Sequence, residues 1–176
     1  MINNDITINS KEMQKIHLTI GITVFILICS TGMQAQTTQT KLNQLELMKQ
    51  FIGTWQSNVG KDSVDVREWQ NYGNAFLMNQ YKLVKGQKGS EGICNIGFDS
   101  EEGNLKGFKI GLDGHYVDWI GLFTSEKIFT IYGTKNFKTG PYGKYTFTFE
   151  SPNIYTTTNY NKDGVVIWVH KFTKVQ

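Results

Sequence analysis

Hydrophobic and polar residues alternate along most of the chain that follows Gly53. The clearest run is GKYTFTFE, in which Tyr145, Phe147 and Phe149 alternate with Lys, Thr and Glu. A period of two gives a segment one apolar and one polar face, as in a half-buried β-strand. Similar short runs, rich in β-branched and aromatic residues, predict nine further strands: TWQSN, SVDVREWQNY, AFLMNQYKLV, EGICNIGF, LKGFKIGL, HYVDWIGLF, KIFTIYGT, NIYTTTNY and VVIWVHKFTKV.

The segments between these runs are typical of hairpin turns. Asp113-Gly114 separates two of the predicted strands, and KGQKG, DSEEGN, TSEK and NKDG separate others. No segment after Gly53 has a helical period long enough for a crossover helix, so we expect antiparallel pairing. An antiparallel meander loses its two exposed edges when it closes. The sequence therefore predicts an all-β fold, a single antiparallel up-and-down barrel of about ten strands over residues 51–176.

The segment before the barrel divides into two parts. Residues 36–50 form a linker that ends in the amphipathic stretch LNQLELMKQ, which predicts a short helix. Residues 1–35 have a basic start, an apolar run and the small residue Ala35, the layout of a cleaved signal peptide, with Met13 as an alternative initiator. The apolar run is shorter than the ~20 residues that span a bilayer. We expect a secreted or periplasmic protein without a membrane anchor; lipidation at Cys29 is disfavoured because the bulky Ile28 precedes it.

Composition and charge narrow the function classes. The chain has 176 residues, enough for one well-cored domain, and its formal charge of +3 comes from 18 basic and 15 acidic residues without a run of like charge. This pattern disfavours a nucleic-acid partner, which favours a clustered basic face. After signal cleavage only Cys94 remains, so no intrachain disulfide can form and Cys94 is interpreted as a small buried hydrophobe.

The stretch FIGTWQ carries a resemblance to a known family. A short helix that leads into a first strand with Gly53-Thr54-Trp55, a meander of strands and a basic residue near the C-terminus resembles the calycin superfamily of lipocalin-like barrels. The segment EGICNIGFDSEEGNLKGFKIGLDG is similar to bacterial lipocalin-like domains of unknown function. The resemblance implies that Trp55 closes the narrow end, that Lys171 or Lys174 packs over its ring, and that Gly53 turns the chain through a positive φ.

A barrel of this size can enclose one small molecule, so the aromatic residues of the strands are candidates for its lining. Arg67 shares a face with Trp69. Facing inward, Arg67 is suited to anchor a ligand carboxylate; facing outward, the commoner arrangement, it pairs with an acid. His115 either lies at the barrel mouth or is an exposed turn histidine. The candidate lining aromatics are Tyr72, Tyr81, Trp119, Tyr145, Phe147 and Trp168.

His170 shares a face of the last strand with Trp168 and Phe172. Nitrobindins, a related branch of the superfamily, bind haem through a His on the final strand, so the resemblance implies haem as an alternative to a plain core or surface histidine.

Catalytic and metal sites find no support in the sequence. It has no G-x-S-x-G, C-x-x-C or H-E-x-x-H motif, and the acidic loop at residues 99–104 lacks the carboxylate spacing of a calcium site. We therefore expect neither an enzyme nor a metal site. The sequence favours a binding protein for a small hydrophobic molecule, with a structural or interaction barrel filled by its own side chains as the alternative. A cavity of roughly 300 Å³ or more favours binding.

Overall fold

The computed structural model describes residues 42–135 and 137–175. The expected signal peptide at residues 1–35, Cys29 and the start of the linker lie outside the described residues. The chain begins with helix α2 (Gln44–Met48) and the 3₁₀ turn η1 (Lys49–Phe51). The strands are β1 (Gly53–Gly60), β2 (Ser63–Tyr72), β3 (Ala75–Val84), β4 (Gln87–Asp99), β5 (Asn104–Gly111), β6 (Tyr116–Ser125), β7 (Ile128–Lys135), β8 (Lys138–Ser151), β9 (Ile154–Tyr160) and β10 (Val166–Val175).

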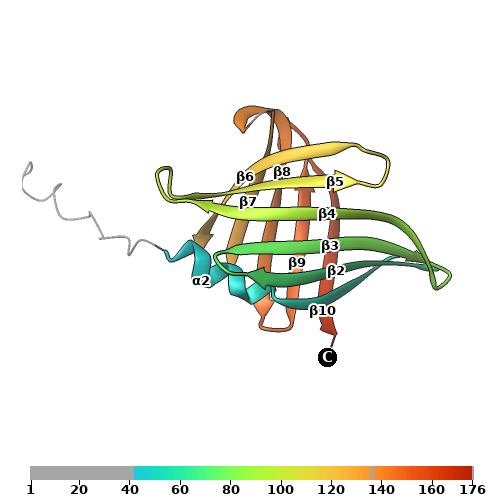
Figure 1. Cartoon of the computed structure of the whole chain (residues 1–176). Helices are drawn as coiled ribbons and strands as arrows, with labels where there is room; N and C mark the ends of the chain where they lie inside the picture. The colour runs from blue at the N-terminus through green and yellow to red at the C-terminus, as the bar shows by residue number, and fades with distance from the viewer. Residues whose placement is uncertain (1–41, 136, 176) are drawn as a thin grey trace, which may run out of the picture. The chain divides into compact units, whose positions relative to one another are not determined.

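The strands form one closed barrel. Each strand pairs antiparallel with the next along the chain, and β1 pairs with β10 to complete the ring (Figure 1). The predicted ten-stranded up-and-down barrel with a short N-terminal helix is confirmed. One hairpin is tighter than expected: Val84 pairs with Gln87, so β4 begins within KGQKG, and Lys85 and Gly86 both take positive φ in a two-residue turn.

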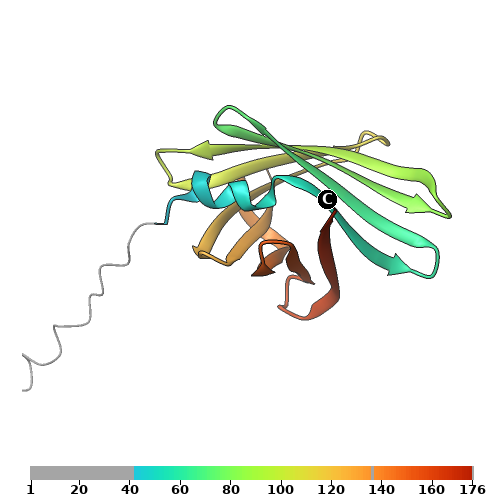
Figure 2. The same ribbon diagram turned by 90° about the horizontal axis from the view of Figure 1, so that it is seen from below.

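Aromatic side chains fill the end of the barrel nearest the helix. Figure 2 shows α2 lying between the strands of the first half and those of the second half. The η1 turn carries Phe51 into this end, where its ring lies 4.7 Å from that of Trp69 and 4.8 Å from that of Phe149. Gln44 fixes the helix by accepting from the Phe123 amide at 2.6 Å. The fully buried side chains here include Phe51, Trp55, Leu105, Phe123, Phe129, Tyr155 and Phe172.

Gly53 and Trp55 have structural roles at the start of β1. Gly53 has φ 121°, a value that favours glycine, and a Cβ built there would lie 2.6 Å from Cε of Lys174. The Trp55 indole is fully buried and donates from Nε1 to the Phe51 carbonyl at 2.6 Å. The Lys174 ammonium lies 5.3 Å from the centre of its ring. Lys171 instead forms an ion pair with Glu150 on the outer surface. Of the two lysines that the resemblance suggested, Lys174 is therefore the one that packs over Trp55.

The contact between the first and last strands is short. Among the described residues, β1 and β10 pair only over Thr54–Gln56 and Thr173–Val175, although both strands continue away from the helix. Beyond this pairing, Val59 and His170 line an open cavity at the barrel mouth. The barrel is therefore packed at its helix end and open at the other. In the part of the chain that the structure describes, no helix has the length and apolarity to span a membrane.

Candidate ligand-binding lumen

The inward faces of the strands enclose a pocket next to the buried aromatic side chains of the helix end, among them Phe51, Trp55 and Phe172, which we call the aromatic plug. Its volume is about 240 Å³. The indole of Trp119 lies against β5, where Gly107 leaves room for it: a Cβ at position 107 would lie 1.9 Å from the ring. The lining is Arg67, Trp69, Met78, Gln80, Cys94, Lys109, Val117, Trp119, Phe129, Ile131, Tyr145, Phe147 and Trp168. We call this space the inner pocket.

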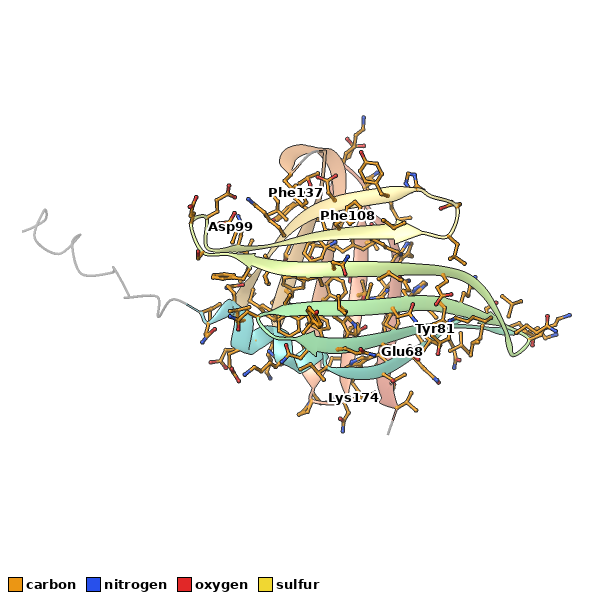
Figure 3. All side chains as sticks on the ribbon, viewed as in Figure 1. Glu68, Tyr81, Asp99, Phe108, Phe137 and Lys174 are labelled. Atoms are coloured by element: carbon orange, nitrogen blue, oxygen red, sulfur yellow. The ribbon has the colours of Figure 1, made fainter. Side chains whose placement is uncertain are left out.

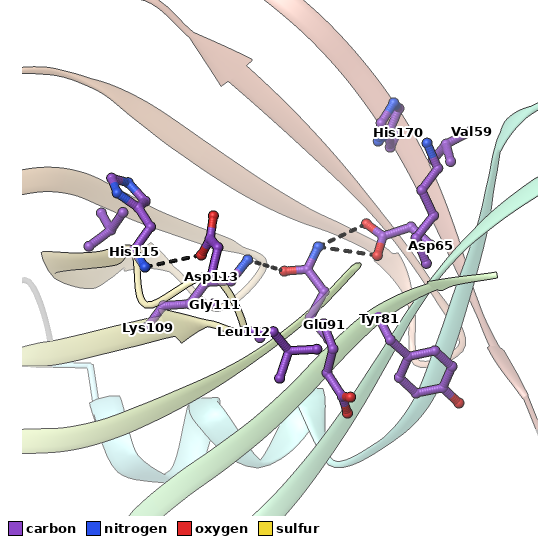
Figure 4. Close-up of a pocket in the computed structure, with 14 residues that line it drawn as sticks. Val59, Asp65, Tyr81, Glu91, Lys109, Gly111, Leu112, Asp113, His115 and His170 are labelled. Carbon is purple, nitrogen blue, oxygen red and sulfur yellow. Dashed lines mark hydrogen bonds between the residues drawn. The ribbon is translucent and has the colours of Figure 1, made fainter. Parts of the chain in front are cut away.

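The inner pocket opens into a wider and more polar cavity at the barrel mouth. This mouth cavity has a volume of about 610 Å³, and it shares Gln80, Lys109 and Val117 with the inner pocket. Its further lining includes Asp65, Lys82, His115 and His170 (Figure 4). An apolar chamber with a polar rim is the arrangement usual for small-molecule sites. The inner pocket alone is smaller than the roughly 300 Å³ that favours binding over a filled barrel, and the space exceeds that size only together with the open mouth cavity.

A chain of polar contacts runs along the wall between the two spaces. Lys109 Nζ donates to Gln80 Oε1 at 2.8 Å, and Gln80 Nε2 donates to both oxygens of Asp65 at 3.1 and 3.2 Å (Figure 4). Arg67 Nη2 donates to Asp65 at 3.4 Å. Asp65 therefore contacts Arg67 directly and is connected to Lys109 only through Gln80.

Arg67 lies inside the barrel, and not on the outer surface where such residues are commoner. Its side chain is 7% exposed. Nη1 donates to Thr157 Oγ1 at 3.3 Å, and the guanidinium carbon lies 4.0 Å from the centre of the Phe172 ring. These contacts hold the guanidinium in one orientation. Arg67 Nε, Trp69 Nε1 and the Tyr155 hydroxyl are buried near one another. Burial raises the pKa of Tyr155 to about 12, against the opposing effect of the Arg67 and Trp69 donors.

The acidic side chains of the lumen, Asp65, Glu91 and Asp113, all line the mouth cavity. Arg67 and Lys109 line the inner pocket, whereas no acidic side chain does. Burial lowers the pKa of Lys109, and the charge of Arg67 lowers it further. Burial also lowers the pKa of His170, with Arg67 and Lys82 acting in the same direction against Asp65. The interior therefore disfavours additional positive charge.

The structure places eight of the nine predicted binding residues in the inner pocket or in the mouth cavity, and Tyr72 and Tyr81 are described below. Trp119, Tyr145, Phe147, Trp168 and Arg67 line the inner pocket. His115 and His170 line the mouth cavity, where His115 is exposed.

Tyr72 and Tyr81 do not line the inner pocket. Tyr72 is 71% exposed at the end of β2. Tyr81 pairs with Val66, on the opposite face from Arg67, and its hydroxyl donates to Glu68 at 2.9 Å (Figure 3). Tyr72 lines neither space, whereas Tyr81 is among the residues that line the mouth cavity. Both tyrosines lie three positions from the inward Trp69 and Met78, so strand alternation turns them away from the inner pocket.

Sequence reasoning missed two polar residues of the lumen, Gln80 and Lys109. Both lie on inward faces that the alternation could have revealed, Gln80 two positions from Met78 and Lys109 two from Gly107. Such residues are seldom buried, so their type argued against an interior position.

The residues around His170 do not fit a haem. The ring stacks on Trp168 with 4.3 Å between ring centres, and it lines the polar mouth cavity but not the inner pocket. A porphyrin bound to this histidine would lie against the polar side chains of Asp65, Lys82 and Lys109. The apolar faces of a porphyrin instead favour an aromatic lining such as that of the inner pocket. Within residues 42–135 and 137–175, no group of three or more His, Cys, Asp and Glu side chains could hold a metal ion.

The chain matches no protein-family model, and no curated protein sequence matches it.

Proposed function

We propose that this protein is a lipocalin-like binding module that holds a small, largely hydrophobic molecule in its lumen. The observation that carries the proposal is the inner pocket of about 240 Å³, which is lined by six aromatic residues from β2, β6, β7, β8 and β10 and continues into the mouth cavity. Burying a ligand against such a lining provides the driving force, since each Å² of apolar surface removed from water contributes about 25 cal/mol. The helix end is closed, so the mouth is the route of access.

The resemblance in the FIGTWQ stretch supports the same proposal. Positive φ at Gly53, burial of Trp55 and the Lys174 ammonium over its ring form the closed end that is expected of a calycin barrel. Such a plug leaves the opposite half of the lumen available to a ligand. The layout of residues 1–35 supports secretion or a periplasmic location as part of the proposal.

Blocking the opening of the inner pocket tests this function. Val117 lines both spaces and is 42% exposed, so Val117→Trp places an indole in the opening without replacing a core residue. Val169→Trp is the matched control, because Val169 is 55% exposed in β10 and lines neither space. The probe is Nile red, a neutral apolar dye, titrated by fluorescence.

We expect the native protein and Val169→Trp to bind the dye equally and Val117→Trp to bind it at least about tenfold more weakly, a loss of ~1.4 kcal/mol. Equal binding by all three proteins places the dye outside the lumen and contradicts the proposal. Absence of binding to the native protein favours the structural barrel filled by its own side chains.

A further inference from the structure

Exposed apolar side chains gather at one end of the barrel. Strand β1 leaves the helix end, so its turn with β2 and every second turn after it lie at the mouth (Figure 1). Nine large apolar side chains at these five turns, or within two residues of them, are at least 41% exposed. At the four turns of the helix end, the described residues expose one such side chain, Tyr72. The six that belong to the β5–β6 and β9–β10 turns are called the apolar rim: Leu112, Tyr116, Val117, Val165, Val166 and Ile167.

The apolar rim borders the entrance to the lumen. Leu112 and Val117 line the mouth cavity, and Val117 also lines the inner pocket. A neighbouring hollow of about 630 Å³ is lined by Tyr116 and Val117 of one turn and by Ile167 of the other, so the two turns face each other across the mouth. Exposed apolar patches of this kind mark surfaces that contact a partner. A partner that covers the rim also covers the route into the lumen.

The β7–β8 turn adds an aromatic ring to this end of the barrel. Phe137 is 41% exposed, and its φ of 56° is unfavourable for a bulky side chain. The buried carboxylate of Asp118 holds the turn, because Oδ2 accepts from the Phe137 amide and also from Thr134 Oγ1. Aromatic side chains are enriched at membrane–water interfaces, so an exposed ring at a fixed place beside the mouth favours a lipid surface as the partner.

The charges of the two ends differ in sign. Counted with two flanking residues on each side, the mouth turns carry six lysines and three aspartates, whereas the helix-end turns carry five acidic residues and one lysine. Ion pairs with neighbouring residues reduce this difference without reversing it: Lys88 pairs with Glu91 at the mouth, and Lys106 and Lys171 pair with acids of the helix end. A basic end favours an anionic surface. The charged residues of the mouth turns are Lys61, Asp62, Lys85, Lys88, Asp113, Lys135, Lys138, Lys162 and Asp163.

We propose that the mouth end of the barrel docks on an anionic lipid surface, with the apolar rim and Phe137 entering the head-group region and the mouth lysines lying among the head groups. Apolar side chains at exposed tips, with lysines beside them, are the features of an interfacial membrane site. A lipid surface adapts to separate tips, whereas a stable protein partner needs a continuous complementary face of about 800 Å². Docking would place the entrance of the lumen against a source of apolar molecules, but the contact itself requires no ligand.

Vesicle binding tests the lipid contact. The protein purified from a secreting host is mixed with vesicles of phosphatidylcholine alone, or of equal parts phosphatidylcholine and phosphatidylglycerol, and the bound fraction is measured by sedimentation. We expect binding at least about tenfold tighter to the mixed vesicles, and a decline of this advantage as the salt concentration rises. Equal binding to both kinds of vesicle, or binding to neither, overturns the inference. Either result leaves the proposed ligand-binding function standing, because the assay contains no lumen ligand.

Matched pairs of exposed residues test which end of the barrel makes the contact. Leu112→Ser changes a mouth residue that is 77% exposed, and Tyr72→Ser changes a helix-end residue that is 71% exposed. Lys162→Gln and Lys127→Gln each remove an exposed turn lysine, the first from the mouth and the second from the helix end. We expect Leu112→Ser and Lys162→Gln each to weaken binding to the mixed vesicles by about fivefold, and both helix-end variants to bind as the native protein does. All variants share residues 1–41, so that segment cannot account for a difference between them.

Equal loss of binding in the mouth and helix-end variants, or no loss in any of them, overturns the inference. Because all four positions are exposed, equal unfolding midpoints in urea are expected and show that each variant keeps the fold. Analytical ultracentrifugation tests a different occupant of the apolar rim, a second copy of this chain. A dimer that Leu112→Ser dissociates, without vesicle binding by the native protein, would assign the rim to self-association and overturn the lipid surface as its partner.

Discussion

The guanidinium carbon of Arg67 lies 4.0 Å from the centre of the Phe172 ring. This contact joins the two halves of the interior, because Phe172 belongs to the aromatic plug and Arg67 lines the inner pocket. The other face of Phe172 is not free either: its ring lies nearly parallel to that of Tyr155, with 5.0 Å between centres. The plug therefore both closes one end of the barrel and orients the guanidinium that lines the inner pocket.

Replacing the Phe172 ring of this stack by a smaller aliphatic side chain should destabilise the fold. Phe172→Leu removes a fully buried aromatic ring and the cation–π contact with Arg67, and we expect a loss of about 1–3 kcal/mol in the free energy of unfolding. Urea denaturation followed by tryptophan fluorescence measures the loss. Val169→Leu, an exposed substitution on the same strand, should change it by less than about 0.5 kcal/mol. Similar effects from both substitutions would show that the stack contributes little.

The two lysines of β10 provide a matched test of the closed end. Lys174 lies over the Trp55 ring, whereas Lys171 forms an exposed ion pair with Glu150. We expect Lys174→Met to cost about 0.5–1 kcal/mol of unfolding free energy and to shift the fluorescence of Trp55. Lys171→Met should cost less than about 0.5 kcal/mol. The reverse order would assign the stabilising role to the ion pair.

Gly53 is expected to be sensitive to substitution because of its backbone conformation. Its φ of 121° is unfavourable for any residue with a Cβ, and the added carbon would also meet Lys174. Gly53→Ala should lower the free energy of unfolding by about 1–3 kcal/mol. Gly97→Ala is the control, since Gly97 has no positive φ and its Cβ would meet no atom within 4 Å. Equal unfolding midpoints in urea for the two variants would contradict the structural role of Gly53.

The thiol of Cys94 should resist modification in the folded protein. Burial raises its pKa from 9.0 to about 11, so the thiolate is scarce near neutral pH. In a Cys29→Ser variant, which leaves Cys94 as the one thiol of the chain, Ellman's reagent should react at least about a hundredfold more slowly in buffer than in urea. Comparable rates in the two solvents would contradict a closed wall at this position.

The raised pKa of Cys94 makes the free energy of unfolding depend on pH. The folded state keeps the thiol protonated in a range where the unfolded chain loses the proton. This contribution to stability is fully present below pH 9.0 and declines as the pH rises toward about 11.

Much of the fold could be predicted from the sequence because alternation and turn residues are local signals. Tyr145, Phe147 and Phe149 all point inward, as the period of two in GKYTFTFE required. The plug was predicted only in part. Phe51 lies before the first strand, and its position at the centre of the aromatic cluster depends on the η1 turn, which periodicity does not reveal.

The inner pocket was harder to predict because it depends on strand register. The inward position of Arg67 follows from its pairing with Gln80, and a shift of one residue would have turned it to the solvent. Lys109 belongs to a residue type that is rarely buried, so its place beside Cys94 was not expected. The meeting of Arg67 and Trp69 with the Tyr155 hydroxyl becomes visible only when the closed barrel brings β2 and β9 together.

Native mass spectrometry of the protein purified from a secreting host without denaturation, with an ultraviolet-visible spectrum of the same sample, tests the central claim most directly. A lumen built to hold a small molecule predicts a reproducible adduct of a few hundred daltons, or one formed on adding Nile red, and its loss in Val117→Trp but not in Val169→Trp. A bare polypeptide mass that no added ligand changes would contradict the account.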